Sequence, residues 1–129
     1  MIITVRGKVS SGIGEGRKFI QLSWVKKQIE KKLGFEPHPG TLNLRLSPNA
    51  PIFVLLNKFS GMEIPAKGNL ASGRLYRALI AGKVYGAIVR PEIPDYPKEL
   101  LEILAPVNLR EKLHLKDGDE LEIKIWLSD

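Results

Sequence analysis

Residues 108–127, NLREKLHLKDGDELEIKIWL, decide the fold. Asn108 and Glu111 have the spacing of a capping box, with Asn in place of the usual Ser or Thr, which predicts a helical turn starting there. Residues 116–118 should form a turn, and residues 120–127 alternate apolar and polar side chains in the manner of a half-exposed strand. This part of the chain therefore predicts a short helix, a turn and a final β-strand.

Short apolar or alternating runs elsewhere predict the other strands. They lie at residues 2–9, 41–46, 52–57, 75–80 and 84–89. A helix is expected at residues 22–33, where apolar residues recur at helical spacing, Ser23 can cap the start and Gly34 follows the end. Residues 10–17 are predicted to form a glycine-rich loop, and a proline-rich segment leads into a second short helix near residues 98–104.

The pattern and the composition together indicate one mainly β domain. The chain has 129 residues, 43% apolar and 26% charged, which fits a single domain over residues 1–129 with one hydrophobic core. About six strands with short turns and a few brief helices favour a β-barrel, because a parallel sheet would need more and longer crossover helices.

Composition also limits the chemistry. The chain has no cysteine and two histidines, so disulfides and thiolate or histidine-built metal sites are excluded, and any bound metal should be held by oxygen. No stretch approaches the roughly 18 apolar residues of a membrane span, so we expect a cytoplasmic protein with no membrane partner. The net charge of +6 favours an anionic partner, but a nucleotide, a flavin phosphate and nucleic acid satisfy it equally.

Two segments carry groups suited to phosphate. In residues 11–17, SGIGEGR, glycines let backbone N–H groups face an anion and Arg17 can add a forked contact. The segment matches neither a P-loop nor a dinucleotide-binding pattern, so a plain flexible connection fits it as well. In residues 105–110, APVNLR, a helical start beside Arg110 can hold a phosphate or simply cap itself. Glu102 is interpreted as a solvated helix carboxylate.

The predicted strand at residues 41–46, TLNLRL, places Thr41 and Asn43 side by side on one face. Two neutral oxygens suit Mg²⁺ when substrate phosphates balance most of its charge. These residue types are also common on the exposed face of a strand, so spacing alone leaves both interpretations open.

Three stretches, in this order, resemble the CTP-dependent riboflavin kinases of archaea. They are GIGEGR at residues 12–17, GFEPHPGTLNL at 34–44 and EILAPVNLREKLHLKDGDELEI at 102–123, whereas residues 47–90 resemble the family loosely. The resemblance implies a six-stranded cradle-loop barrel that transfers the γ-phosphoryl group of CTP to the 5′-hydroxyl of riboflavin, giving FMN and CDP.

The resemblance also implies which residues bind the nucleotide and a metal. The nucleotide-binding positions are Gly12, Ile13, Gly14, Glu15, Gly16, Arg17, Val107, Asn108, Leu109 and Arg110. Thr41 and Asn43 become ligands of Mg²⁺. No residue is assigned as a general base, because phosphoryl transfer depends mainly on positioning and charge neutralisation.

Two flavin contacts follow from the same resemblance. Glu102 falls where the family contacts the flavin. The second contact, usually a threonine in the family, falls on Pro94, which has no hydroxyl. Asp95 or Tyr96 could supply the missing contact.

Two other interpretations stay open. Residues 110–123 also look like the AbrB-type swapped-hairpin transcription factors, which are DNA-binding dimers, but that pattern leaves the glycine loop and residues 41–43 without a role. A barrel of the same family that binds flavin or nucleotide without catalysis is the other alternative. We expect a monomer whose partners are CTP or CDP and riboflavin or FMN, and no nucleic acid.

Overall fold

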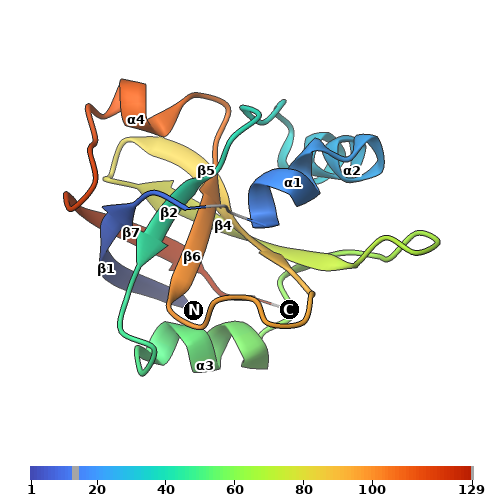
Figure 1. Cartoon of the computed structure of the whole chain (residues 1–129), viewed down its shortest axis with the longest axis horizontal. Helices are drawn as coiled ribbons and strands as arrows, with labels where there is room; N and C mark the ends of the chain where they lie inside the picture. Colours follow the sequence, from blue (N-terminus) through green and yellow to red (C-terminus); the bar gives the residue numbers. More distant parts are fainter. Residues whose placement is uncertain (13–14, 129) are drawn as a thin grey trace.

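A computed structural model describes residues 1–12 and 15–128 of the chain (Figure 1). The described residues form a seven-stranded antiparallel sheet in the order β3-β4-β5-β6-β2-β1-β7, and β7 also pairs with β4. That last pairing closes six strands into a barrel and leaves β3 as an extension on β4, which confirms the predicted barrel. The strands are β1 Ile2–Ser10, β2 Leu42–Arg45, β3 Met62–Ile64, β4 Gly73–Ile80, β5 Val84–Pro91, β6 Leu100–Leu104 and β7 Glu120–Trp126.

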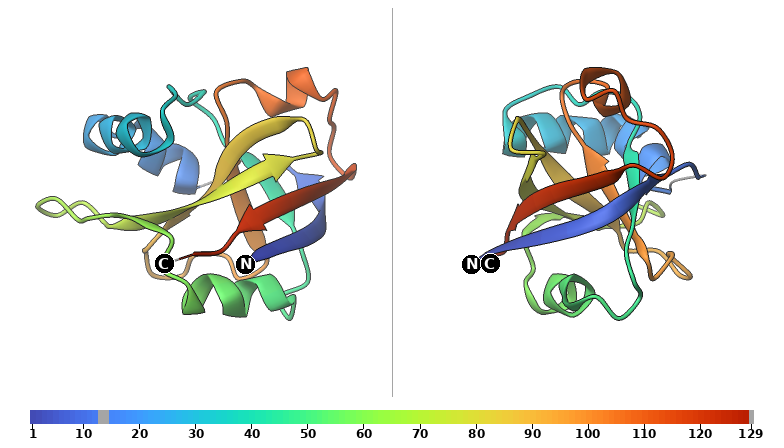
Figure 2. Two further views of the ribbon diagram at one scale, coloured as in Figure 1. Left: turned by 180° about the vertical axis from the view of Figure 1, so that it is seen from behind. Right: turned by 90° about the vertical axis from the view of Figure 1, so that its left-hand side faces the viewer.

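Four helices in the described part of the chain surround the barrel. They are α1 Glu15–Gln21, α2 Ser23–Leu33, α3 Pro51–Lys58 and α4 Leu109–Lys112. Helix α3 lies across one end of the barrel and α4 lies at the opposite end, while α1 and α2 lie against its outer face (Figures 1 and 2). Among the described helices, none combines the length and the apolar character that crossing a membrane would require.

The barrel interior holds the larger hydrophobic core. Leu44, Ile88 and Ile123 point inward from three different strands and are fully buried. Ile52 and Leu56 of α3 belong to the same cluster, so this helix closes the end of the barrel that it covers.

A second core lies between the outer barrel face and the first two helices. Phe19 of α1 and Val25 and Ile29 of α2 cluster with Val89 of β5 and Leu104 of β6. Strands β5 and β6 are therefore covered on both faces, and they lack the apolar and polar alternation of a strand with one wet face.

Most predicted elements are confirmed. The strands predicted at residues 2–9, 41–46, 75–80, 84–89 and 120–127 correspond to β1, β2, β4, β5 and β7. Helix α2 ends at Gly34, which has the left-handed φ of 78° that favours glycine. The predicted cap was wrong, because Leu22 holds the N-cap position of α2 and no side chain caps it. At α4 the Asn108 side chain does accept a hydrogen bond from the Glu111 N–H at 3.3 Å.

Two predicted elements were of the wrong type. Residues 52–57 are not a strand but the helix α3, in which Ile52 and Leu56 are 1% exposed while Val54 between them is 69% exposed. Burial at i and i+4 is the helical period, and Pro51 in the first turn favours a helix start. Residues 98–104 are not a helix, because residues 100–104 form strand β6 with every side chain buried. The predicted loop at residues 10–17 also ends earlier, since α1 begins at Glu15.

Candidate functional site: a polar cleft beneath the first helix

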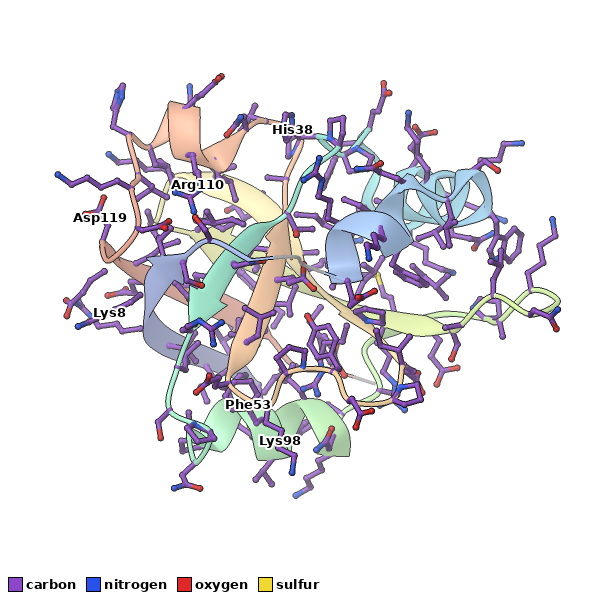
Figure 3. All side chains as sticks on the ribbon, in the orientation of Figure 1. Lys8, His38, Phe53, Lys98, Arg110 and Asp119 are labelled. Carbon is purple, nitrogen blue, oxygen red and sulfur yellow. The ribbon has the colours of Figure 1, made fainter. Side chains whose placement is uncertain are left out.

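The sequence-predicted phosphate and metal residues meet at the end of the barrel that carries α4. His38 and Arg110 mark this end (Figure 3). A cavity of about 370 Å³ opens there. Its wall is formed by Ser10, Ser11, Gly12, Arg17, His38, Pro39, Gly40, Thr41, Asn43 and Arg110. Residues from four separate parts of the chain thus share one cleft, which we call the polar cleft.

A smaller cavity adjoins the polar cleft and contains the other predicted nucleotide residues. Its volume is about 170 Å³, and Val107, Asn108 and Leu109 line it. His38 and Arg110 belong to the walls of both cavities. The structure therefore places the two predicted nucleotide-binding segments next to each other. Ile13 and Gly14 lie outside the described residues. Glu15 belongs to the wall of neither of these two cavities and forms an exposed ion pair with Lys18.

Asn43 presents an unused acceptor to the polar cleft. Its side chain is 7% exposed, and its Oδ1 atom has no hydrogen-bond partner among the described residues. The hydroxyl of Ser10, in the same wall, is likewise buried without a partner. Buried polar atoms are nearly always paired, so these two atoms in the cavity wall are available to a water molecule or a ligand. The chain passes so close to Asn43 that a Cβ on Gly12 would lie 2.8 Å from the Asn43 Nδ2 atom.

Glu102 lies opposite Asn43 on the neighbouring strand β6 and is 0% exposed. The expectation of a solvated helix carboxylate was therefore wrong, because β6 is a strand whose outer face α1 covers. The carboxylate accepts hydrogen bonds from the Gly16 N–H at 2.7 Å, the Thr41 hydroxyl at 2.7 Å and the Tyr96 hydroxyl at 2.6 Å. These donors come from three segments distant in sequence, so Glu102 holds them together.

The first turn of α1 can approach Glu102 only because residue 16 is glycine. A Cβ built on Gly16 would lie 2.7 Å from Oε2 of Glu102 and 3.0 Å from its Oε1, which is closer than real Cβ contacts. The glycines at positions 12 and 16 thus permit close contact with the two polar side chains of β2 and β6. This is a different role from the backbone flexibility that the sequence suggested.

Tyr96 connects the polar cleft to a further cavity. Burial and the neighbouring Glu102 carboxylate raise the pKa of the Tyr96 hydroxyl well above its ordinary value, so it remains a proton donor. The side chain also lines a cavity of about 470 Å³ that includes Pro94. Of the two substitutes considered for the hydroxyl missing at position 94, it is Tyr96 that contacts Glu102.

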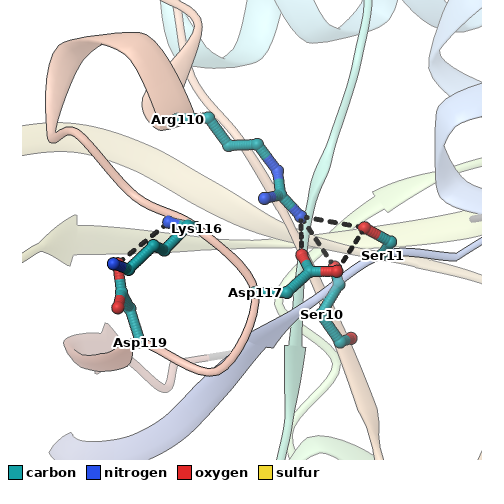
Figure 4. Close-up of polar contacts among 6 residues, drawn as sticks. All are labelled: Ser10, Ser11, Arg110, Lys116, Asp117 and Asp119. Carbon is teal, nitrogen blue, oxygen red and sulfur yellow. Dashed lines mark hydrogen bonds and ion pairs between the residues drawn. The ribbon is translucent and has the colours of Figure 1, made fainter.

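Arg110 is held in place by a residue that the sequence did not single out. Its Nη2 atom donates to Oδ1 of Asp117 at 2.7 Å and to the backbone oxygen of Ser10 at 3.1 Å (Figure 4). The Ser11 hydroxyl donates to the other oxygen of Asp117 at 2.7 Å. The hydrogen bond from Ser11 and the contact with Arg110 lower the pKa of Asp117. This cluster ties the end of β1 to the segment after α4.

The fold and the cleft together define a small closed β-barrel domain with a polar cleft to which its first helix contributes Arg17. The chain belongs to the CTP-dependent riboflavin kinase family: the family model CTP-dep_RFKase, described as "Domain of unknown function DUF120", matches residues 9–125. This membership confirms the resemblance seen in the sequence, and the match includes the C-terminal segment that also looked like AbrB-type proteins.

Several archaeal proteins named riboflavin kinase are similar to the chain. The one from Archaeoglobus fulgidus is 40% identical over 134 residues, which cover 97% of this chain and 55% of that protein. The one from Pyrobaculum aerophilum is 43% identical over 130 residues, covering 97% and 61%. The one from Saccharolobus solfataricus is 37% identical over 131 residues, covering 97% and 75%. The chain thus spans a little over half the length of the first two relatives.

Proposed function

We propose that the chain is a CTP-dependent riboflavin kinase, which transfers the γ-phosphoryl group of CTP to the 5′-hydroxyl of riboflavin and releases FMN and CDP. The observation that carries this proposal is that Gly12, Arg17, Thr41, Asn43 and Arg110 line one cavity. A polar cleft with two arginines and open backbone suits a nucleoside triphosphate, whose transfer chemistry needs positioning and charge neutralisation more than a covalent catalyst.

The nucleotide occupies the two adjoining cavities. Arg17 and the backbone around Gly12 face the phosphates, and Arg110 lies where the two cavities meet. Residues 107–109 line the smaller cavity. With the phosphates in the polar cleft, the smaller cavity holds the nucleoside. Because Asp117 already orients the Arg110 guanidinium, little side-chain freedom is lost when a ligand binds.

Mg²⁺ fits the residues predicted to hold it. Asn43 offers a buried side-chain oxygen that has no other partner, and Thr41 keeps lone pairs on the hydroxyl that donates to Glu102. Neutral oxygen ligands of this kind suit Mg²⁺ bound largely through phosphates. When bound, the ion would neutralise charge that develops on the transferred phosphoryl group.

Riboflavin lies on the Glu102 side of the polar cleft. Glu102 accepts hydrogen bonds from Thr41, which lines the polar cleft, and from Tyr96, which lines the cavity that contains Pro94. A flavin that extends from the Pro94 cavity toward the polar cleft brings its ribityl chain past Glu102 to the phosphate site. The Tyr96 hydroxyl donates its proton to Glu102 and can still accept a hydrogen bond from the ribityl chain, in place of the contact that Pro94 lacks.

The deciding experiment is to incubate the chain with riboflavin, Mg²⁺ and each of the four nucleoside triphosphates, and to quantify FMN by chromatography. We expect FMN to form with CTP much faster than with ATP. Equal rates with all four nucleotides would refute the nucleotide assignment. Binding of riboflavin and CTP without FMN formation would instead identify a non-catalytic barrel.

A further inference from the structure

The cavity beyond Tyr96 contains Pro94, and its wall also contains an arginine, Arg90, to which neither the family match nor the sequence motifs assign a role. It measures about 470 Å³, within the range of about 300–1,000 Å³ for small-molecule pockets. Its wall includes Arg74, Tyr76, Arg90, Pro91, Pro94 and Tyr96. We call it the arginine–tyrosine cavity.

Arg90 is the polar group of this cavity that lacks a partner. Its Nη1 atom is buried and makes no hydrogen bond within the described part of the chain. Burial lowers the pKa of the Arg90 guanidinium, and no ion pair with a described carboxylate compensates for its desolvation. A guanidinium stays charged in proteins, so the fold keeps a poorly solvated positive donor in the wall of a cavity.

Apart from Asn57, which is exposed to solvent, the other polar residues of the wall already have partners. Arg74 pairs with Glu92, with 3.2 Å between Nε and Oε1. The Tyr76 hydroxyl lies 2.7 and 2.6 Å from the backbone oxygens of Leu56 and Phe59. The Tyr96 hydroxyl donates to Glu102. A ligand in the cavity would therefore meet one unused buried donor, on Arg90, between flat aromatic and proline surfaces.

We propose that Arg90 is a specificity-determining residue for riboflavin, donating a hydrogen bond to a carbonyl oxygen of the isoalloxazine ring held in the arginine–tyrosine cavity. The inference rests on the proposed kinase function. The ring is planar, largely apolar and neutral, and it carries its carbonyl acceptors at one end, which matches flat walls with a single strong donor. From this cavity the ribityl chain passes Tyr96 and Glu102 toward Asn43.

The test uses lumichrome, which has the tricyclic ring without the ribityl chain, and riboflavin, both titrated by fluorescence quenching without nucleotide or metal. We expect Arg90→Met to weaken both compounds by a similar factor, about ten- to a hundredfold for loss of a charge-assisted hydrogen bond. CTP affinity should not change. The matched control is Arg6→Met, which removes the same charge from a side chain that is 69% exposed on β1.

A second readout separates ligand binding from folding. Because Arg90 is desolvated and Nη1 has no partner, Arg90→Met without ligand should unfold at the same or a higher urea concentration than the wild type. Wild-type affinity of Arg90→Met for both ring compounds would overturn the inference, and so would weakening of riboflavin alone or a lower unfolding midpoint. If the wild type binds lumichrome but makes no FMN from CTP, the kinase assignment fails while the ring site stands.

Discussion

Glu102 should contribute far more to folding than a carboxylate in a short helix would. It is 0% exposed and accepts hydrogen bonds from Gly16, Thr41 and Tyr96. Glu102→Ala leaves three donors without their acceptor. Each buried donor that loses its acceptor costs about 1–3 kcal/mol. Water that enters from the cleft can accept hydrogen bonds from some of these donors. We therefore expect the free energy of unfolding to fall by about 3–5 kcal/mol.

The matched control for this change is Glu99→Ala. Glu99 lies just before β6 and pairs with Arg45 at 2.7 Å, but the two side chains are 49% and 47% exposed. An exposed ion pair contributes about 0–1 kcal/mol, so the two variants lose the same group and differ in burial. Urea unfolding followed by circular dichroism measures both. At a slope of about 2 kcal/mol per molar urea, the midpoint of Glu102→Ala should fall by about 2 M and that of Glu99→Ala by less than about 0.5 M.

The hydrogen bonds around Glu102 also predict how the stability costs of two substitutions combine. Tyr96→Phe removes one donor together with its need for an acceptor, so the double variant Glu102→Ala/Tyr96→Phe should cost less than the sum of the single changes. Additive costs, or a Glu102→Ala midpoint equal to that of Glu99→Ala, would show that this carboxylate does not hold the segments together.

Three further outcomes are expected from single changes in the site. Asn43→Ala should lower kcat at limiting Mg²⁺ by roughly a hundredfold, a few kcal/mol of lost transition-state stabilisation. Its melting temperature should be nearly unchanged, because no described residue contacts the Oδ1 atom through a hydrogen bond. Asp117→Asn should raise KM for CTP about three- to tenfold and leave KM for riboflavin unchanged, since Arg110 loses its charged partner. Pro94→Thr should bind riboflavin about as tightly as Pro94→Ala in fluorescence titrations, because Tyr96 already supplies the hydroxyl beside Glu102.

Two of the elements that the sequence predicted correctly, β7 and α2, each have one exposed face. The strand β7 has a burial pattern that alternates along its length, and the single apolar stripe of α2 was equally clear. The spacing of apolar residues identifies such elements because solvent on one side requires polar residues there, which leaves a regular alternation along the sequence. It failed at β6, LLEIL, because the barrel core covers one face of this strand and the layer under α1 covers the other.

The sequence predicted only those residues of the candidate site that belong to a recognisable motif. Glycine loops and the pair Thr41 and Asn43 stand out as residue types at a fixed spacing. Arg90 and Asp117 have no such signal, because their roles arise from what the fold brings near them: a cavity beside Arg90, and Ser11 and Arg110 beside Asp117. Desolvation and long-range pairing are properties of the tertiary structure, and a single sequence does not record them.

The lone pairs of Glu102 bear on whether one residue could both hold the fold and, as proposed, contact riboflavin. An ionised carboxylate offers about four acceptor positions, two on each oxygen. Oε2 uses two of them for the Gly16 N–H and the Tyr96 hydroxyl, whereas Oε1 uses one for the Thr41 hydroxyl. Counting the donors in the described part of the chain, one position remains on Oε1, the oxygen that accepts from Thr41. Under the proposed function, a riboflavin hydroxyl that reached this buried oxygen would not have to displace any of the three described donors, so substrate binding and the stability of the barrel would not compete for this carboxylate.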